Sequence, residues 1–268
     1  QKESEKQAIK WFENKLNKSI TEINKAYSKY RISEALMITY KLIWDDFCSW
    51  YLEIIKPNYG NPINIKTYNE TIKYLESLLK LLHPFMPFIT EEIWHLIQEK
   101  TDDIIIADWP KSLNFNEELL LEFKNTSDVV SSIRKFRKEK QVASKDKITL
   151  LIKMNKKINK DMDTIILKLC NTEIEYTEDK PENAYSFMIN SNEYFIPLKG
   201  NIDLASEKQK LIKEIDYTKG FLKIVESKLS NKNFVKNAPN HLVENERKKL
   251  EDAKNRMKIL ESKLSDLS

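Results

Sequence analysis

Scarcity of glycine is the feature that most constrains the fold of this chain. Only 3 of its 268 residues are Gly, where average usage of about 7% would give roughly 19. Gly60, Gly200 and Gly220 are also far apart in the sequence. A phosphate-binding loop needs two or three glycines close together, because its backbone adopts positive φ and approaches the ligand closely. The chain therefore contains no Rossmann dinucleotide site, P-loop or kinase-type nucleotide loop, and long helices are favoured.

Charge is nearly balanced over the whole chain but is unevenly distributed along it. The chain has 45 basic and 41 acidic residues and a formal net charge of +4. Residues 206–268 carry 15 basic and 10 acidic side chains, so this segment alone has a charge of +5. Such a distribution predicts a polyanionic partner for the C-terminal quarter.

Cysteine usage and hydropathy predict a cytoplasmic protein with no membrane association. Cys48 and Cys170 are far apart and have no second Cys or His at ligand spacing, so we expect neither a disulfide framework nor a metal site. No apolar run reaches the ~18 residues that span a bilayer, and the N-terminal residues show no signal-peptide core. The chain begins without Met in a charged helical pattern, which predicts a fragment of a longer protein.

Apolar residues recur at helical spacing over most of the first 140 residues. We expect two helices within 1–56, broken near residues 30–33, a third over about 64–82, and another near 116–140. Between them, residues 81–97 contain two prolines three apart and Thr90 before Glu91, which indicates a kink followed by a helix capped by Thr90. Five helices in this span predict an all-α bundle.

The pattern changes after Val142. Residues 147–153 form a β-branched run, 185–190 and 193–198 flank a Ser-Asn turn, 173–176 is a possible strand, and 158–169 has helical spacing. These segments predict a small α/β unit.

Two heptad series occupy the C-terminal residues. The first places apolar or small residues at Leu204, Leu211, Ile215, Thr218, Leu222, Val225 and Leu229. The second places them at Val243, Leu250, Ala253, Met257, Leu260, Leu264 and Leu267, with Glu246 at the remaining seam position. Pro239 interrupts the connector, so we expect an antiparallel helical hairpin with arms of roughly 40 Å. A coiled-coil dimerisation device is the alternative.

Three stretches together resemble the C-terminal part of the valyl-tRNA synthetases, a family of class I aminoacyl-tRNA synthetases. RISEAL (31–36) leads into KLIWDDFCSWYLEIIKP (41–57), and LLHPFMPFITEEIW (81–94) is followed by ADWP (107–110). Both stretches resemble a helical domain that the valine, isoleucine and leucine enzymes share. The third stretch, KLSNKNFVKNAPNHLVENERKKL (228–250), resembles the C-terminal arm peculiar to the valine enzymes.

The resemblance implies a mainly α chain in three parts. Residues 1–146 would form a helical-bundle anticodon-binding domain, 147–203 a small α/β subdomain, and 204–268 an antiparallel coiled-coil tRNA-binding arm. A full enzyme of this family joins valine to its tRNA with ATP as substrate. The catalytic Rossmann motifs and the editing domain have no counterpart here, so we expect no catalytic residue and no cofactor in this fragment. We expect a monomer that binds the anticodon stem-loop and the outer corner of valine-specific tRNA.

The expected tRNA contacts are cations in two groups and one aromatic residue, because phosphate recognition requires only Lys or Arg. The first group ends a helix, where the helix dipole offers an alternative explanation: Arg134, Lys135, Arg137 and Lys138. The second lies in the arm: Lys219, Lys223, Lys228, Lys232, Lys236, Arg247 and Lys248. Phe234 would cap a base pair or, alternatively, close the turn as a hydrophobic plug.

Several other candidate residues have a structural interpretation that we favour. Four aromatic residues could stack on unpaired bases, but their spacing fits a buried helix face better: Trp44, Phe47, Trp50 and Tyr51. Asp45 and Asp46 point about 100° apart on a helix, so we expect solvated or Arg-paired carboxylates. His83 has no positioned partner in the sequence, which favours a structural histidine over a catalytic one.

Two rival functions remain open from the sequence. One is the isoleucine or leucine enzyme of the same class. The lack of paired cysteines counts against the isoleucine enzymes, which commonly end in a cysteine-ligated zinc module. The other rival is a non-enzymatic helical protein that oligomerises through its coiled coil.

Overall fold

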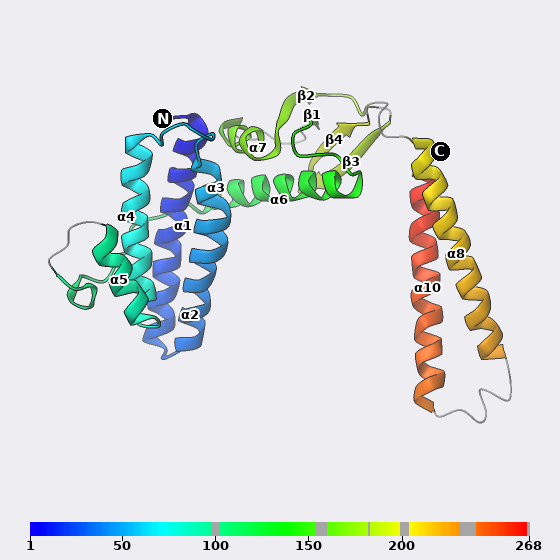
Figure 1. Cartoon of the computed structure of the whole chain (residues 1–268), viewed down its shortest axis with the longest axis horizontal. Helices are drawn as coiled ribbons and strands as arrows, with labels where there is room; N and C mark the ends of the chain where they lie inside the picture. Colours follow the sequence, from blue (N-terminus) through cyan, green and yellow to red (C-terminus); the bar gives the residue numbers. More distant parts are fainter. Residues whose placement is uncertain (98–101, 154–159, 182, 199–203, 231–239, 267–268) are drawn as a thin grey trace. The chain divides into compact units, whose positions relative to one another are not determined.

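The computed structural model describes residues 1–97, 102–153, 160–181, 183–198, 204–230 and 240–266. It divides into two compact units, Gln1–Pro197 and Leu198–Ser268. Helices dominate both units, and the first also contains a small sheet (Figure 1). The expected mainly α fold with a small α/β part is confirmed. The finer division at residues 146 and 203 stays a prediction.

The helices of the first unit follow the predicted order. They are α1 (Glu3–Ser28), α2 (Ile32–Lys41), the π-helix η1 (Leu42–Tyr51), α3 (Leu52–Ile55), α4 (Ile65–Leu82), α5 (Pro87–Ile97), the 3-10 turn η2 (Ile104–Ile106) and α6 (Glu117–Glu139). Asn64 caps α4 by accepting a 3.0 Å hydrogen bond from the backbone N–H of Lys66, and Asn116 caps α6 in the same way.

One predicted helix start is wrong. Helix α5 begins at Pro87, three residues before the expected cap, because proline is well suited to a first helical turn where its missing N–H is not needed. Thr90 therefore lies inside the helix, and its hydroxyl donates a 2.8 Å hydrogen bond back to the carbonyl of Met86.

Helices α2, η1 and α3 form one continuous rod with a π-helical middle. Leu42 and Leu52, at the two junctions, both have right-handed helical backbone angles. The hydroxyl of Ser49 donates a 2.8 Å hydrogen bond to the carbonyl of Trp44, five residues earlier. A π-helix of ten residues is unusual, because π geometry mostly occurs as single turns and often at functional sites.

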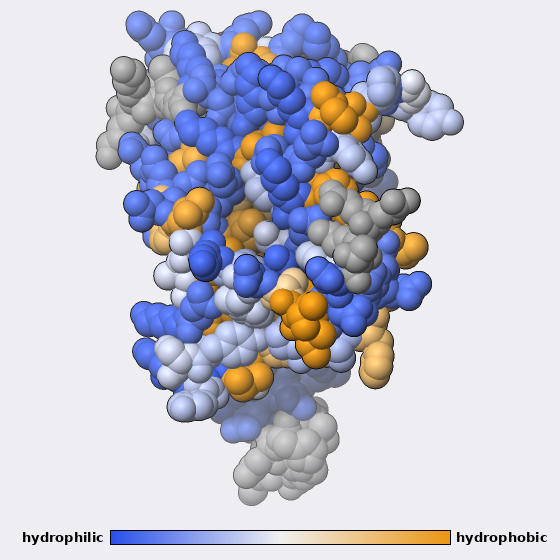
Figure 2. Space-filling view, turned by 90° about the vertical axis from the view of Figure 1, so that its left-hand side faces the viewer, coloured by the Kyte–Doolittle hydropathy of each residue, from blue (hydrophilic) through white to orange (hydrophobic). Residues whose placement is uncertain are grey.

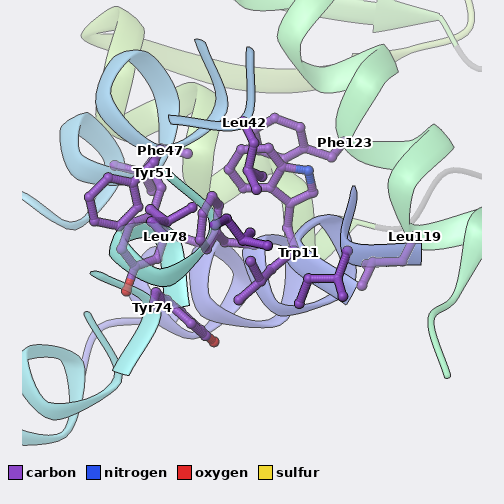
Figure 3. Packing of buried hydrophobic residues seen from close by; sticks show 14 of the residues in the cluster. Trp11, Leu42, Phe47, Tyr51, Tyr74, Leu78, Leu119 and Phe123 are labelled. Carbon is purple, nitrogen blue, oxygen red and sulfur yellow. The ribbon is translucent and has the colours of Figure 1, made fainter. Parts of the chain in front are cut away.

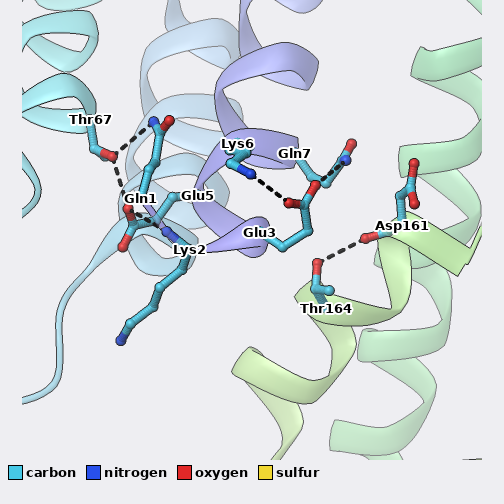
Figure 4. Close-up of polar contacts among 9 residues, drawn as sticks. All are labelled: Gln1, Lys2, Glu3, Glu5, Lys6, Gln7, Thr67, Asp161 and Thr164. Atoms are coloured by element: carbon cyan, nitrogen blue, oxygen red, sulfur yellow. Dashed lines mark hydrogen bonds and ion pairs between the residues drawn. The ribbon is translucent and has the colours of Figure 1, made fainter.

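Polar contacts fix the start of α1 against α4 (Figure 4). Thr67 on α4 donates a 2.9 Å hydrogen bond to the carboxylate of Glu5, which also accepts a 3.3 Å bond from the backbone N–H of Lys2. Gln1 donates to the same threonine hydroxyl at 3.2 Å. A carboxylate in the first turn also interacts favourably with the helix dipole.

Aromatic side chains fill the core between α1, η1, α4 and α6 (Figure 3). The rings of Trp11 and Phe123 are stacked at 3.6 Å between centroids, which joins α1 to α6. The ring of Phe12 contacts those of Tyr51 and Tyr74, at 4.9 and 5.1 Å between centroids, and the two tyrosine rings also contact each other. Such pairs contribute more than their buried area alone. Outside this core, one face of the molecule shows predominantly hydrophilic side chains, with the apolar ones in small separate groups (Figure 2).

The sheet of the first unit has four strands in the order β2-β1-β4-β3. The strands are β1 (Ile148–Lys153), β2 (Thr172–Thr177), β3 (Ala184–Ile189) and β4 (Asn192–Pro197). Strands β1 and β2 are parallel, and the 3-10 turn η3 (Lys160–Met162) and helix α7 (Asp163–Cys170) come between them in the chain. The predicted hairpin of β3 and β4 is confirmed, but its turn lies one residue earlier than expected: it comprises Asn190, at φ 54°, and Ser191, and Asn192 begins β4.

The second unit is a helical hairpin of α8 (Leu204–Ser230) and α10 (Asn240–Asp266). Lys228 faces Glu246, and Glu226 faces Lys254, so the two helices are antiparallel. Every heptad position whose side chain the structure describes is buried or half-buried, as predicted: Ile215, Thr218, Leu222, Val225, Leu229, Val243, Glu246, Leu250, Ala253, Met257, Leu260 and Leu264. Among the described helices, none has both the length and the apolar character needed to cross a membrane.

Candidate nucleic-acid interface

The exposed cations of the arm form its most distinct surface feature. Lys219 and Lys223 lie one turn apart on α8, next to the seam positions Thr218 and Leu222, and both are exposed. Neither makes an ion pair with a residue in the described part of the chain. Two exposed lysines one turn apart provide adjacent positive charges for a polyanion.

A second group of cations surrounds a buried carboxylate at the seam. Glu246 is 9% exposed and accepts a 2.8 Å hydrogen bond from Lys249 on its own helix. The ammonium of Lys228, on α8, lies 3.9 Å from the other carboxylate oxygen. The hydrogen bond from Lys249 is the main cause that lowers the pKa of Glu246. Arg247 and Lys248 follow directly on α10 and are exposed.

Three expected contacts of the arm lie outside the described residues. Lys232, Phe234 and Lys236 fall within 231–239, between the ends of the two helices. Their role at the end of the hairpin stays a prediction. The other expected contacts of this arm are described and all exposed: Lys219, Lys223, Lys228, Arg247 and Lys248.

The cations at the end of α6 have different environments. Arg134 is exposed, and its guanidinium lies 5.7 Å from the ring centre of Trp50. Lys138 is exposed, and Lys135 pairs loosely with Glu139 at 3.9 Å. These three side chains remain accessible to a polyanion.

Arg137, in the same run, is buried at 8% exposure. It donates hydrogen bonds to the carbonyl oxygens of Ala143 at 2.6 Å, Cys170 at 2.8 Å and Asn171 at 3.3 Å. Burial lowers the pKa of the guanidinium. Because its donors are directed into the protein, the structure gives Arg137 a packing role in place of the expected contact with tRNA. Sequence reasoning could not separate it from Arg134, since both lie in the same basic run.

The four aromatic residues around η1 do not share one environment. Phe47 and Tyr51 are buried, as predicted, and Trp50 is half-buried with its ring edge against Phe123. The prediction of a buried face is wrong for Trp44, which is 60% exposed. Its ring is stacked on that of Tyr40, which is also exposed, at 6.4 Å and 12°. Tyr40 was not predicted as part of this group, although its spacing of four residues from Trp44 places the two rings on one helix face.

Two further expectations concern single side chains. His83 accepts or donates a 2.8 Å hydrogen bond with the hydroxyl of Thr90, a structural role. Asp46 is paired at 3.3 Å with Lys15, in place of the expected solvent or arginine. Burial is the main cause that raises the pKa of Asp46, and the lysine opposes it.

Comparison with protein families identifies the class of domain to which these residues belong. Residues 9–152 match the family model of the anticodon-binding domain of tRNA ligases. Since this match covers more than half of the chain, the chain belongs to that class of domain. Residues 203–268 match the tRNA-binding arm of valyl-tRNA synthetase. The two matches together show that the chain corresponds to the C-terminal region of the valyl-tRNA synthetase family.

Individual relatives agree with this assignment. The valine–tRNA ligase of Christiangramia forsetii is 47% identical over 271 aligned residues, which cover 100% of this chain and 31% of the relative. That of Porphyromonas gingivalis is 42% identical with the same coverage, and that of Enterococcus faecalis is 34% identical over 97% of this chain. The chain thus spans about a third of the length of these relatives. These comparisons do not support the alternative hypotheses, an isoleucine or leucine enzyme or an oligomerisation protein.

Proposed function

We propose that this chain binds tRNA for valine as part of an enzyme that joins valine to that tRNA with ATP. The observation that carries the proposal is the presence, in one chain, of an anticodon-binding domain and a tRNA-binding arm. The chain itself supplies binding, and the chemistry belongs to parts of the enzyme beyond the matched third. A monomer in the cytoplasm stays our expectation.

The two units have different tasks in this proposal. The helical domain binds the anticodon stem-loop, with Arg134, Lys135 and Lys138 near the phosphates and the exposed Tyr40–Trp44 stack available to an unpaired base. The arm binds the outer corner of the tRNA through its backbone. Phosphate contacts carry little sequence information, so the arm adds affinity and the helical domain adds specificity.

The salt dependence of tRNA binding tests the role of the arm. Replacing Lys219, Lys223 and Lys228 with Ala removes up to three phosphate contacts. The plot of log affinity against log salt concentration should then flatten by up to about 3 units of slope. Fluorescence anisotropy with valine tRNA at several salt concentrations measures this slope.

A matched control distinguishes the effect of local phosphate contacts on this slope from the effect of total charge. Lys73, Lys124 and Lys147 lie in the first unit and are paired with Glu70, Asp128 and Glu173. Their replacement by Ala changes the net charge equally, but it should leave the slope within error of the unmodified chain. An arm variant with an unchanged slope, or a control variant with the same loss, would contradict the proposed role of the arm. Loss of preference for valine tRNA over isoleucine tRNA should follow changes in the helical domain only.

A further inference from the structure

Three potential metal ligands converge near the end of α5, and none of them is among the proposed tRNA contacts. Glu91 and His95 are one helical turn apart, and Asp103 precedes η2. The Nε2 atom of His95 lies 3.2 Å from Oε1 of Glu91 and 3.3 Å from Oδ1 of Asp103. All three donor atoms lie within 4.8 Å of one another.

The two nitrogen–oxygen distances fit a small divalent ion. Zinc binds His nitrogen at about 2.0–2.1 Å and carboxylate oxygen at about 2.0–2.2 Å in tetrahedral geometry. Two such ligands on one tetrahedral ion are therefore about 3.3–3.5 Å apart. The two nitrogen–oxygen distances here are close to that range. The imidazole favours a transition metal over Mg²⁺ or Ca²⁺, which prefer oxygen ligands alone.

The surrounding structure already orients the donors. The backbone N–H of Ile104 donates a 2.9 Å hydrogen bond to Oε1 of Glu91, which fixes this carboxylate toward the other two side chains. The indole of Trp94 donates a 3.1 Å bond to the carbonyl of Asp102. Trp94 and Ile104 are both buried and form a small core with Leu79. Outer-shell contacts of this kind typically position metal ligands.

We propose that Glu91, His95 and Asp103 bind one divalent transition-metal ion, with Zn²⁺ the best fit and water as the fourth ligand. The two carboxylates neutralise the charge of the ion. Bound there, the ion joins α5 to the segment that begins η2 and stabilises this corner of the helical domain. The role is structural and independent of tRNA binding.

Calorimetric titration with ZnCl₂ tests the site in the untagged 268-residue chain after treatment with a chelator. Every protein carries Cys48→Ser, because Cys48 is exposed and could bind zinc alone. We expect one equivalent to bind, and we expect Co²⁺ in its place to give the visible absorption typical of tetrahedral sites. His95→Ala and Asp103→Asn should weaken binding by more than the roughly 10- to 100-fold that loss of an outer-shell partner costs.

Glu92→Gln is the matched control, since Glu92 is exposed on the same helix and is not one of the three donors. It should bind Zn²⁺ with unchanged affinity, and saturating Zn²⁺ should raise its melting temperature as it does for the Cys48→Ser protein. His95→Ala should show no such rise. Equal binding by His95→Ala, or no zinc binding by the Cys48→Ser protein, would overturn the proposal. In the latter case the three side chains are an ion-pair cluster only.

Discussion

Arg137 donates a 2.8 Å hydrogen bond from Nη2 to the carbonyl oxygen of Cys170, which connects the end of α6 to the end of α7. A further hydrogen bond, to Ala143, holds the segment that follows α6. One buried guanidinium thus joins the helical part of the first unit to the helix that precedes β2. A planar group with five donors in a fixed fork suits such a junction.

Replacement of Arg137 should affect stability, and replacement of Arg134 should not. Arg137→Ala leaves buried carbonyls without donors, so we expect the free energy of unfolding to fall by about 3 kcal/mol. Arg137→Lys should not restore it, since the ammonium lacks the fork geometry. Arg134→Ala should change stability by no more than about 0.5 kcal/mol. Urea denaturation measures all three, and equal effects at both positions would contradict the assigned packing role.

Replacement by Ala should also distinguish the buried aromatic residues of η1 from the exposed ones. Tyr51 is fully buried and bonded to Thr71 at 2.9 Å, so Tyr51→Ala should cost about 3–5 kcal/mol of stability. Trp44→Ala should leave stability nearly unchanged but weaken binding of valine tRNA by about 1–3 kcal/mol if its ring stacks on a base. Thermal denaturation and anisotropy measure the two effects. Unchanged tRNA affinity in Trp44→Ala would remove this residue from the interface.

Glu246 should limit the stability of the arm. One of its carboxylate oxygens is buried without a hydrogen bond in the described structure, at a position where the heptad pattern calls for an apolar residue. We therefore expect Glu246→Leu to raise the melting temperature of the arm helices, followed by circular dichroism. Sedimentation checks whether the apolar seam also permits association, because a polar seam residue helps to specify register and oligomeric state. A lower melting temperature would show that the contacts with Lys228 and Lys249 outweigh the burial.

The same carboxylate predicts a pH dependence. The pKa of Glu246 is lower in the folded arm than in the unfolded chain, so ionisation of this carboxylate favours the folded state over the unfolded one. This contribution of ionisation is fully present above the unfolded pKa of about 4.3. The contribution is lost as the pH falls through the lower folded value. Melting curves between about pH 2 and pH 6 should therefore show a loss at low pH that is smaller in Glu246→Leu. Identical pH profiles of the two proteins would exclude Glu246 as the cause.

The two cysteines should differ in reactivity. Cys170 is buried, and burial raises the pKa of its thiol to about 11. Cys48 is exposed, although partial burial raises its pKa as well. Because the thiolate is the reactive form, a disulfide reagent should label Cys48 in the folded protein, and faster as the pH rises. Cys170 should react only as the protein unfolds, and rapid labelling of both in the folded state would contradict its burial.

Much of the fold follows from local patterns in the sequence. The heptad spacing placed Ile215 and Val225 at the seam, and the Ser-Asn pair located the hairpin turn to within one residue. These features depend on residues close in the chain, which periodicity detects directly. The parallel pairing of β1 with β2 was not predicted, because it depends on contacts between distant segments.

The candidate sites were less predictable for the same reason. Arg137 and Arg134 belong to one basic run, and only the position of α7 separates the buried residue from the exposed one. His95 was not predicted as a site residue, because its partner Asp103 lies outside helix α5 and the two side chains meet only through a tertiary contact. The exposure of Trp44 depends on which elements pack against η1, and apolar spacing does not reveal this.

That π geometry also has a consequence for changes in chain length. A hydrogen bond that spans five residues encloses one residue more than the bond of an α-helix. Deleting one residue between Leu42 and Tyr51 could therefore be absorbed by converting part of η1 to α-helix, with α2 and α3 kept in phase. In an ordinary helix the same deletion would rotate everything that follows. This segment is thus a position where related chains can differ by one residue while the rod and the core beneath it persist.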